Sequence, residues 1–304
     1  MAQSKQPATL LDHPLVDGNP PPWATAWGQD EYGIYAEFTI TNNDVQATQR
    51  MRWLPAGRFT MGSPEDEPGR HPHEGPQHEV TLTRSFWIFD TPCTQRLWRA
   101  VMGENPSRFV DDERPVEQVS WEDAVAFANR VAELQPLLPL SLLTEAQWEY
   151  ACRGGTTDAT YAGPIEIRGK NDAPILHEIA WYGGNSGVDF DLDWGHGWDS
   201  ESWPEKQFNH ARAATRRVAR KEPTAWGMFD MLGNVWEWCS DWLGDYEAED
   251  LVDPAGPTDS HSRVLRGGSW NDTARLARSA CRYGDGPGYR SSYIGFRCAL
   301  VQEG

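Results

Sequence analysis

Hydrophobic and polar residues alternate with period two over residues 35–40, the pattern of a strand with one buried face. The Asn42-Asn43-Asp44 triplet predicts the turn that ends this strand. A second strand is predicted over residues 51–61, with a turn inside it at Pro55, and a third over residues 78–89. The first part of the chain is therefore expected to form a sheet.

The period then changes to that of helices. Thr94 is placed to cap a helix that runs to about residue 101 and ends at Gly103. Ser120 begins an S-x-x-D capping box before a helix over residues 121–134, and Thr144 begins T-x-x-Q before a short helix that ends near residue 152. We expect three capped helices here.

Regular periodicity fades after residue 155, and the stretch to residue 225 is rich in Gly, Trp and Asp. Irregular segments this long inside a domain are usually functional or stabilised by a ligand. Short strands are predicted over 235–242, 263–270, 278–283 and 294–300. Early helices and short late strands indicate an α+β domain.

Composition narrows the class of protein. The 304 residues carry a net charge of −18, which argues against a general affinity for nucleic acid. No apolar stretch approaches the roughly 18 residues of a membrane span. Residues 1–22 are polar, Pro-rich and unlike a signal peptide, so we expect a flexible arm, one domain over 23–304 and a cytoplasmic location.

Five cysteines lie far apart and form no C-x-x-C motif. Zinc-ribbon and thioredoxin-like sites are therefore excluded, and a disulfide framework is not expected in a chain of this size without a signal peptide. We expect most of them to be packed, reduced thiols.

Seven segments together carry a resemblance to a known family. They are PAGRFTMGS (55–63), HEVTLTRSFWI (78–88), PVEQVSWEDAVAFAN (115–129), LLTEAQWEYACRGG (142–155), WGMFDMLGNVWEWCSDW (226–242), RVLRGGSW (263–270) and IGFRCAL (294–300). In this order they resemble the formylglycine-generating enzyme (sulfatase-modifying factor) family. The resemblance implies a C-type-lectin-like α+β fold with few helices, short twisted sheets and much irregular structure, and an insertion over about 187–214. The Trp residues inside these segments are expected to be core or the floor of the binding face.

The family includes copper-dependent oxidases, iron-dependent sulfoxide synthases and non-catalytic binding proteins, so membership does not fix function. In the oxidases two copper-binding cysteines follow Gly-Gly-Ser at the third and eighth residues. After Ser269 these positions hold Asp272 and Ala277, neither of which can replace a thiolate at a Cu(I) centre. No copper is expected.

The resemblance also implies one cofactor, the structural Ca²⁺ that members of the family carry. One family site corresponds to the segment 226–238, where side-chain and backbone oxygens would suit Ca²⁺. The residues implied as ligands are Asp230 and Glu237 through their side chains and Leu232, Gly233 and Val235 through their carbonyls.

The C-terminal segment, residues 271–297, has an unusual composition. Five Arg from Arg275 to Arg297 alternate with small, hydroxyl and aromatic residues, which resembles a paratope. Lys, Glu, Gln, Met and Trp are all absent, and these are the residues that codons ending in a pyrimidine cannot specify. This pattern resembles the variable proteins of diversity-generating retroelements, which mutate adenines in AAC-type codons. The positions implied as varied and ligand-binding are Asn271, Asp272, Thr273, Leu276, Cys281, Tyr283, Gly284, Asp285, Tyr289, Ser291, Ser292 and Tyr293.

Residues 263–297 carry seven Arg and two Asp, a charge of +5 in an acidic chain. We expect most of these arginines to be framework residues, stacked on Trp or paired with carboxylates, although a basic surface for an acidic partner is the alternative.

Three functions stay open. The first is a non-catalytic protein that binds an unknown protein or other macromolecule through a variable face. The second is a metal-dependent oxidase or sulfoxide synthase of the same family, with a metal site that the sequence does not locate. His71, His73 and His78 cluster in the sequence, but their spacing is not that of ligands on one helix face, and we expect a solvated polar loop there. The third is a partner module that docks through the segment 23–27.

Overall fold

The largest sheet of the protein has six strands in the order β1-β2-β3-β6-β17-β7. The computed structural model describes residues 20–42 and 44–301, so most of the arm predicted for residues 1–22 lies outside the described residues. The strands of this sheet are β1 (Ala26–Asp30), β2 (Gly33–Asn42), β3 (Val45–Leu54), β6 (Phe86–Phe89), β7 (Ser141–Leu142) and β17 (Cys298–Val301).

The alternation near the start of the chain produces β2 as predicted. Ala36, Phe38 and Ile40 are buried, and β2 pairs antiparallel with β3 in a register that places Asn42 opposite Val45. The strand predicted over 51–61 is two strands, because the chain leaves the large sheet at Pro55. Its second half, β4 (Gly57–Met61), belongs to a three-stranded sheet with β5 (His78–Leu82) and β13 (Leu251–Val252).

The strand predicted over 78–89 is also divided between two sheets. It breaks after Leu82, where the backbone amide of Thr83 donates a hydrogen bond to the Asp253 carboxylate at 2.8 Å. The chain then enters the large sheet as β6. Period-two patterning identified the extended residues, but it could not identify the crossing from one sheet to another.

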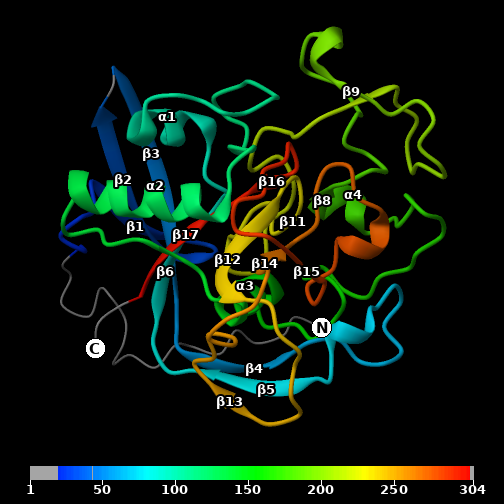
Figure 1. Cartoon of the computed structure of the whole chain (residues 1–304), viewed down its shortest axis with the longest axis horizontal. Helices are drawn as coiled ribbons and strands as arrows, with labels where there is room; N and C mark the ends of the chain where they lie inside the picture. Colours follow the sequence, from blue (N-terminus) through cyan, green and yellow to red (C-terminus); the bar gives the residue numbers. More distant parts are fainter. Residues whose placement is uncertain (1–19, 43, 302–304) are drawn as a thin grey trace.

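The three predicted helices are confirmed, together with their caps. They are α1 (Gln95–Met102), α2 (Trp121–Leu134) and α3 (Glu145–Arg153). The hydroxyls of Thr94, Ser120 and Thr144 each accept a hydrogen bond from the backbone amide three residues on, and the last two complete capping boxes. Helices α1 and α2 cover one face of the large sheet (Figure 1).

The segment predicted to be irregular, 155–225, contains only short elements. They are α4 (Leu176–Ile179), β8 (Ala180–Trp181), the single 3₁₀ turn Trp194–His196, β9 (Trp198–Asp199) and β10 (Arg212–Ala213). Strands β9 and β10 pair with each other, and β8 pairs with β11 (Leu232–Gly233). The irregularity expected from the sequence is therefore confirmed.

A four-stranded sheet, in the order β15-β14-β12-β16, carries the C-terminal third of the chain. Its strands are β12 (Trp236–Trp242), β14 (Arg263–Arg266), β15 (Arg282–Asp285) and β16 (Ile294–Gly295). The strand predicted over 278–283 begins only at Arg282, because residues 278–281 form a turn that buries the Arg278 side chain. The last predicted strand, 294–300, divides into β16 and β17, which lie in different sheets.

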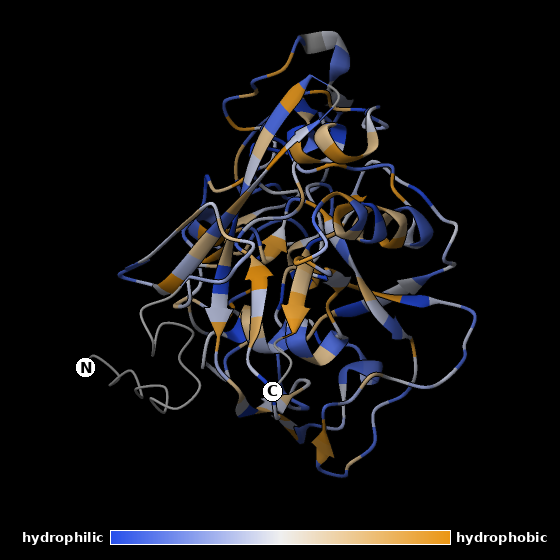
Figure 2. Cartoon of the chain, turned by 90° about the vertical axis from the view of Figure 1, so that its left-hand side faces the viewer, coloured by the Kyte–Doolittle hydropathy of each residue, from blue (hydrophilic) through white to orange (hydrophobic). Residues whose placement is uncertain are grey.

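The core consists largely of aromatic side chains between these sheets and helices. Trp87, Trp148, Trp238 and Trp270 are all fully buried, and all four lie in the family segments. Trp121, Trp226 and Trp242 of the same segments are only partly buried. Hydrophobic colour follows the strands at the centre of Figure 2. Within the described ranges no helix is long and apolar enough to cross a membrane.

Candidate ligand-binding surface

The C-terminal segment is held in place by buried arginines. Arg278 pairs with Glu74 at 2.6 Å and also with Glu67, Arg282 pairs with Glu145 at 2.6 Å, and all of these side chains are buried. Bidentate guanidinium–carboxylate pairs fix both position and orientation. Each pair joins the segment to a distant part of the chain, so the backbone of 271–297 is anchored to the core at several points.

The remaining arginines of residues 263–297 are engaged as well. Arg263 stacks between the rings of Trp121 and Trp242, Arg266 pairs with Glu149, Arg297 with Glu237 and Arg290 with Asp123, and Arg275 donates to the Gly69 carbonyl. The framework interpretation is therefore confirmed. The +5 charge is largely neutralised by acids from elsewhere in the chain and does not form a free basic surface.

Tyrosines face outward between these anchors. Tyr283 is 53% exposed and Tyr289 is 41% exposed. The Tyr289 and Tyr293 hydroxyls lie 3.0 Å apart in a hydrogen bond, and the Tyr283 ring lies 5.9 Å from the buried ring of Trp236. Partial burial and the Tyr289 hydroxyl raise the pKa of Tyr293 to about 12. These rings form an amphipathic surface with little rotamer freedom.

Ten of the twelve predicted ligand-binding positions are accessible to solvent, and two are not. Cys281 is 1% exposed in the main core, and Ser292 is buried with its carbonyl accepting a hydrogen bond from the Trp270 indole at 2.9 Å. The prediction that Cys281 and Ser292 contact the ligand is therefore wrong. A side chain varied at either position would change the packing of the core instead of the surface.

The insertion contributes a second wall beside the C-terminal segment. Trp203 packs 5.9 Å from Trp270, and Tyr293 belongs to the same apolar cluster. Trp198, which is 46% exposed, carries the Arg108 guanidinium over its ring at 4.9 Å. Sequence analysis did not identify Arg108, because nothing in the pattern of residues 104–113 indicated that this loop meets the insertion.

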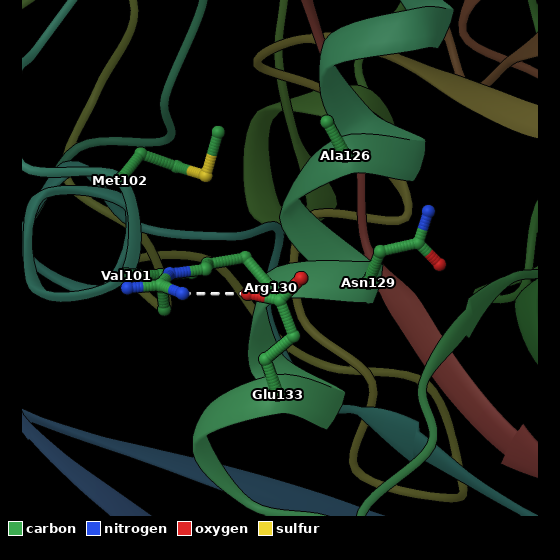
Figure 3. A pocket seen from close by; sticks show the side chains of 6 residues that line it. All are labelled: Val101, Met102, Ala126, Asn129, Arg130 and Glu133. Carbon is green, nitrogen blue, oxygen red and sulfur yellow. Dashed lines mark hydrogen bonds and ion pairs between the residues drawn. The ribbon is translucent and has the colours of Figure 1, made fainter.

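A separate hollow of about 450 Å³ lies between α1 and α2 (Figure 3). Met102 and Ala126 give it an apolar part, and the Arg130–Glu133 ion pair borders it. None of the twelve predicted positions lines it, so it is distinct from the tyrosine surface.

Comparison with known proteins identifies the family. The chain matches the sulfatase-modifying factor enzyme 1-like domain over residues 37–301. The protein belongs to this family. It is 30% identical to the formylglycine-generating enzyme of Mus musculus over 232 residues, 73% of this chain and 53% of that protein. It is 33% identical to that of Streptomyces coelicolor over 213 residues, 66% of this chain and 57% of that protein. The chain thus spans about half the length of these curated relatives.

Among solved structures, Treponema denticola variable protein 1 matches with a TM-score of 0.66 and 29% identity. The match covers 88% of this chain and 99% of that chain. The expected fold, the C-type-lectin-like α+β fold of the formylglycine-generating-enzyme family, is confirmed, as is the resemblance to a variable protein.

The positions that carry copper-binding thiols in the family's oxidases do not fit copper here. Asp272 is half-buried and accepts a hydrogen bond from the Ser269 hydroxyl at 2.5 Å, and burial raises its pKa to about 6. Ala277 is fully buried. Burial raises the pKa of the Cys281 thiol to about 12, and Cys298 lies near Cys93 in the apolar core. This arrangement gives no exposed pair of thiolates.

The residues predicted to bind calcium meet around one turn, but Glu237 is already neutralised. Its two carboxylate oxygens accept hydrogen bonds from Arg297 at 2.7 and 2.8 Å, and one also accepts from the Trp148 indole. Asp230 accepts from the backbone amide of Ala219 at 2.8 Å, and burial raises its pKa to about 6. Leu232 and Gly233 form β11, and Val235 is buried beside it. Calcium here stays a prediction, and it would have to compete with Arg297.

The three histidines of the loop before β5 do not converge. The rings of His71 and His73 stack 5.3 Å apart, whereas buried His78 packs against Tyr246 and bonds to the Pro76 carbonyl. No group of three or more His, Cys, Asp or Glu residues suited to a metal occurs in the part of the chain that the structure describes.

Proposed function

We propose that this protein is a non-catalytic ligand-binding protein that displays a hypervariable C-terminal surface on a C-type-lectin scaffold, as the variable protein of a diversity-generating retroelement does. Its ligand would be a protein or another macromolecule. The separation of roles within residues 271–297 is the observation that supports it most. The buried arginines are tied to core carboxylates, and the exposed tyrosines lie between them.

This separation is what diversification of a binding surface requires. Side chains at exposed positions can change at little cost in stability, because most large losses come from buried groups. The exposed residues are also of the types that form paratopes, since Tyr offers a large contact area with only two rotatable side-chain bonds. Trp198 with Arg108 and the Tyr289–Tyr293 pair are residue types typical of interface hot spots.

The alternative is an oxidase of the same family, which the 30% identity to a formylglycine-generating enzyme keeps open. Asp272 and Ala277 argue against it, because a Cu(I) centre prefers soft thiolate ligands. The two functions predict different results from two direct measurements.

The first measurement is sequencing. The coding region for residues 263–297 is sequenced deeply from a grown population, together with the adjacent DNA. We expect a near-identical template copy, and differences confined to adenines in codons for exposed positions. An invariant segment with no template would contradict diversification.

The second measurement is copper content and activity. The purified protein is incubated with Cu(I) and then with a sulfatase-derived cysteine peptide. We expect neither stoichiometric copper nor an aldehyde product by mass spectrometry. One copper per chain with aldehyde formation would establish the oxidase instead.

A further inference from the structure

The backbone of residues 186–191 wraps around the side chain of Arg216. The guanidinium donates hydrogen bonds to the carbonyl oxygens of Ser186 at 3.2 Å, Val188 at 2.6 Å and Asp189 at 3.0 Å. The carboxylate of Asp191 lies 3.6 Å from its Nε and is paired more closely with the buried guanidinium of Arg114. The Arg216 side chain is only 9% exposed, so this is an interior charge in a cradle of oxygen atoms.

Converging carbonyl and carboxylate oxygens are the ligands that hard cations such as Ca²⁺ take in proteins. Here the positive charge and the hydrogen-bond donors belong to the protein itself. In addition, the side chain of Ser186 has a buried Oγ with no hydrogen-bond partner among the described residues.

The position of Arg216 is fixed from the opposite side. Its backbone amide donates to the Asn234 side chain at 2.9 Å, and the Asn234 amide donates back to its carbonyl at 3.0 Å. The Trp181 ring lies 4.6 Å from the guanidinium carbon. A rigid attachment of this kind lets one charge order a segment that has little regular structure.

The same chemistry recurs further along the insertion. The Lys206 ammonium donates to the carbonyls of Ser200 at 2.7 Å and His210 at 2.6 Å, and to that of Glu201 at 3.2 Å. Two side-chain cations thus gather the backbone carbonyls of residues 186–210, where strands are only two residues long.

We propose that Arg216 is the built-in cation of the 186–191 segment, and that removing its side chain converts this cradle into a binding site for a divalent cation. The segment includes Phe190, which packs together with Leu192 and Trp203 against the apolar cluster that contains Trp270, the residue before the C-terminal segment. Arg216 therefore keeps the second wall of the surface ordered without a metal. The proposal does not depend on what the surface binds.

The test compares Arg216→Ala with the wild type in EDTA and in about 5 mM CaCl₂, a concentration chosen for a weak site. We expect the variant to have a lower Tm in EDTA and at least ten-fold faster amide exchange over 185–214. Calcium should restore both, and calorimetry should find one more bound Ca²⁺ per chain than in the wild type. An identical loss with and without calcium, or no loss at all, overturns the proposal.

Two further sets of variants complete the test. Arg212→Ala changes a residue of the same insertion but removes a more exposed ion pair to Asp199, so it should lose little stability and show no response to calcium.

If Arg216→Ala does not fold, Arg216→Lys and Arg216→Met replace it. A cation role requires the lysine variant to be the more stable of the two, and equal stabilities overturn it. Asp230→Asn subtracts any calcium bound at the Asp230 turn from the calorimetric count.

Discussion

Arg297 and Glu237 form a bidentate ion pair in the interior, with the guanidinium Nε and Nη2 lying 2.7 and 2.8 Å from the two carboxylate oxygens. The same guanidinium donates to the carbonyls of Phe89 and Phe229, so it joins β12, β6 and the turn before β11. The pair therefore connects the two largest sheets behind the exposed C-terminal segment.

Breaking this pair should destabilise the protein strongly. Glu237→Gln leaves the Arg297 charge buried without a counterion, which typically costs about 3–5 kcal/mol in the free energy of unfolding. Urea unfolding at pH 7 measures it. The matched control is Asp123→Asn, which removes the partner of Arg290 in an exposed pair and should cost about 0–1 kcal/mol, together with some loss from the helix cap. If both variants lost the same free energy of unfolding, the burial of the Arg297–Glu237 pair would add nothing to its contribution to stability.

Exposed tyrosines should tolerate replacement that the core does not. We expect Tyr283→Ser and Tyr289→Ser to change the free energy of unfolding by about 1 kcal/mol or less, because neither ring is enclosed. Cys281→Tyr should unfold or strongly destabilise the protein, because a large side chain must enter a filled core. Thermal denaturation of the three variants measures these differences in stability. A stable Cys281→Tyr protein would show that position 281 can belong to the variable surface.

The cysteines should be unreactive in the folded protein. All five thiols are buried, and burial raises the pKa of Cys152 and Cys281 to about 12. A thiol that keeps its proton reacts slowly with disulfide reagents. We expect no labelling by Ellman's reagent at pH 8 without denaturant, and five labelled thiols per chain in guanidinium chloride. Rapid labelling of two thiols in the native protein would instead indicate an accessible pair.

Local signals in the sequence predicted the helices and failed at the strands that change sheets. Thr94, Ser120 and Thr144 determine helix starts through hydrogen bonds to residues three positions away, so the pattern was sufficient. At the break between β5 and β6, Thr83 is hydrogen-bonded to Asp253, which lies 170 residues away in the sequence. No local pattern contains a contact of that range.

The candidate surface was predictable as a segment but not residue by residue. The composition of 271–297 indicated arginines as framework, and their pairing partners confirm it. The burial of Cys281 and Ser292 follows from the turn at 278–281 and from Trp270, and the contribution of Arg108 follows from the fold of the insertion. These are tertiary effects, which a period or a codon pattern does not encode.

Glu117 should make stability depend on pH in an unusual direction. It is fully buried; one carboxylate oxygen accepts a hydrogen bond from the Phe109 amide at 2.8 Å, and the other has no partner among the described residues. Burial raises its pKa to about 8, against an ordinary value of 4.5. Between these two values the folded state keeps a proton that the unfolded state has released. Glu117 therefore contributes a loss of stability as the pH rises from 4.5 to 8, and no further change above 8.

Glu117→Gln isolates this contribution, because the amide resembles the neutral acid and cannot ionise. Asp90 and Asp241, whose pKa values burial raises to about 7, give slopes of the same sign, but these cancel when the variant is compared with the wild type at each pH. We expect the free energy of unfolding of the variant to rise relative to that of the wild type between pH 5 and pH 8. The rise should be at most about 1.4 kcal/mol per pH unit and up to a few kcal/mol in total. Urea unfolding at intervals of one pH unit measures this difference. Glu104→Gln, at an exposed position, should show no such trend. A constant difference between variant and wild type would mean that Glu117 is ionised in the folded protein throughout this range.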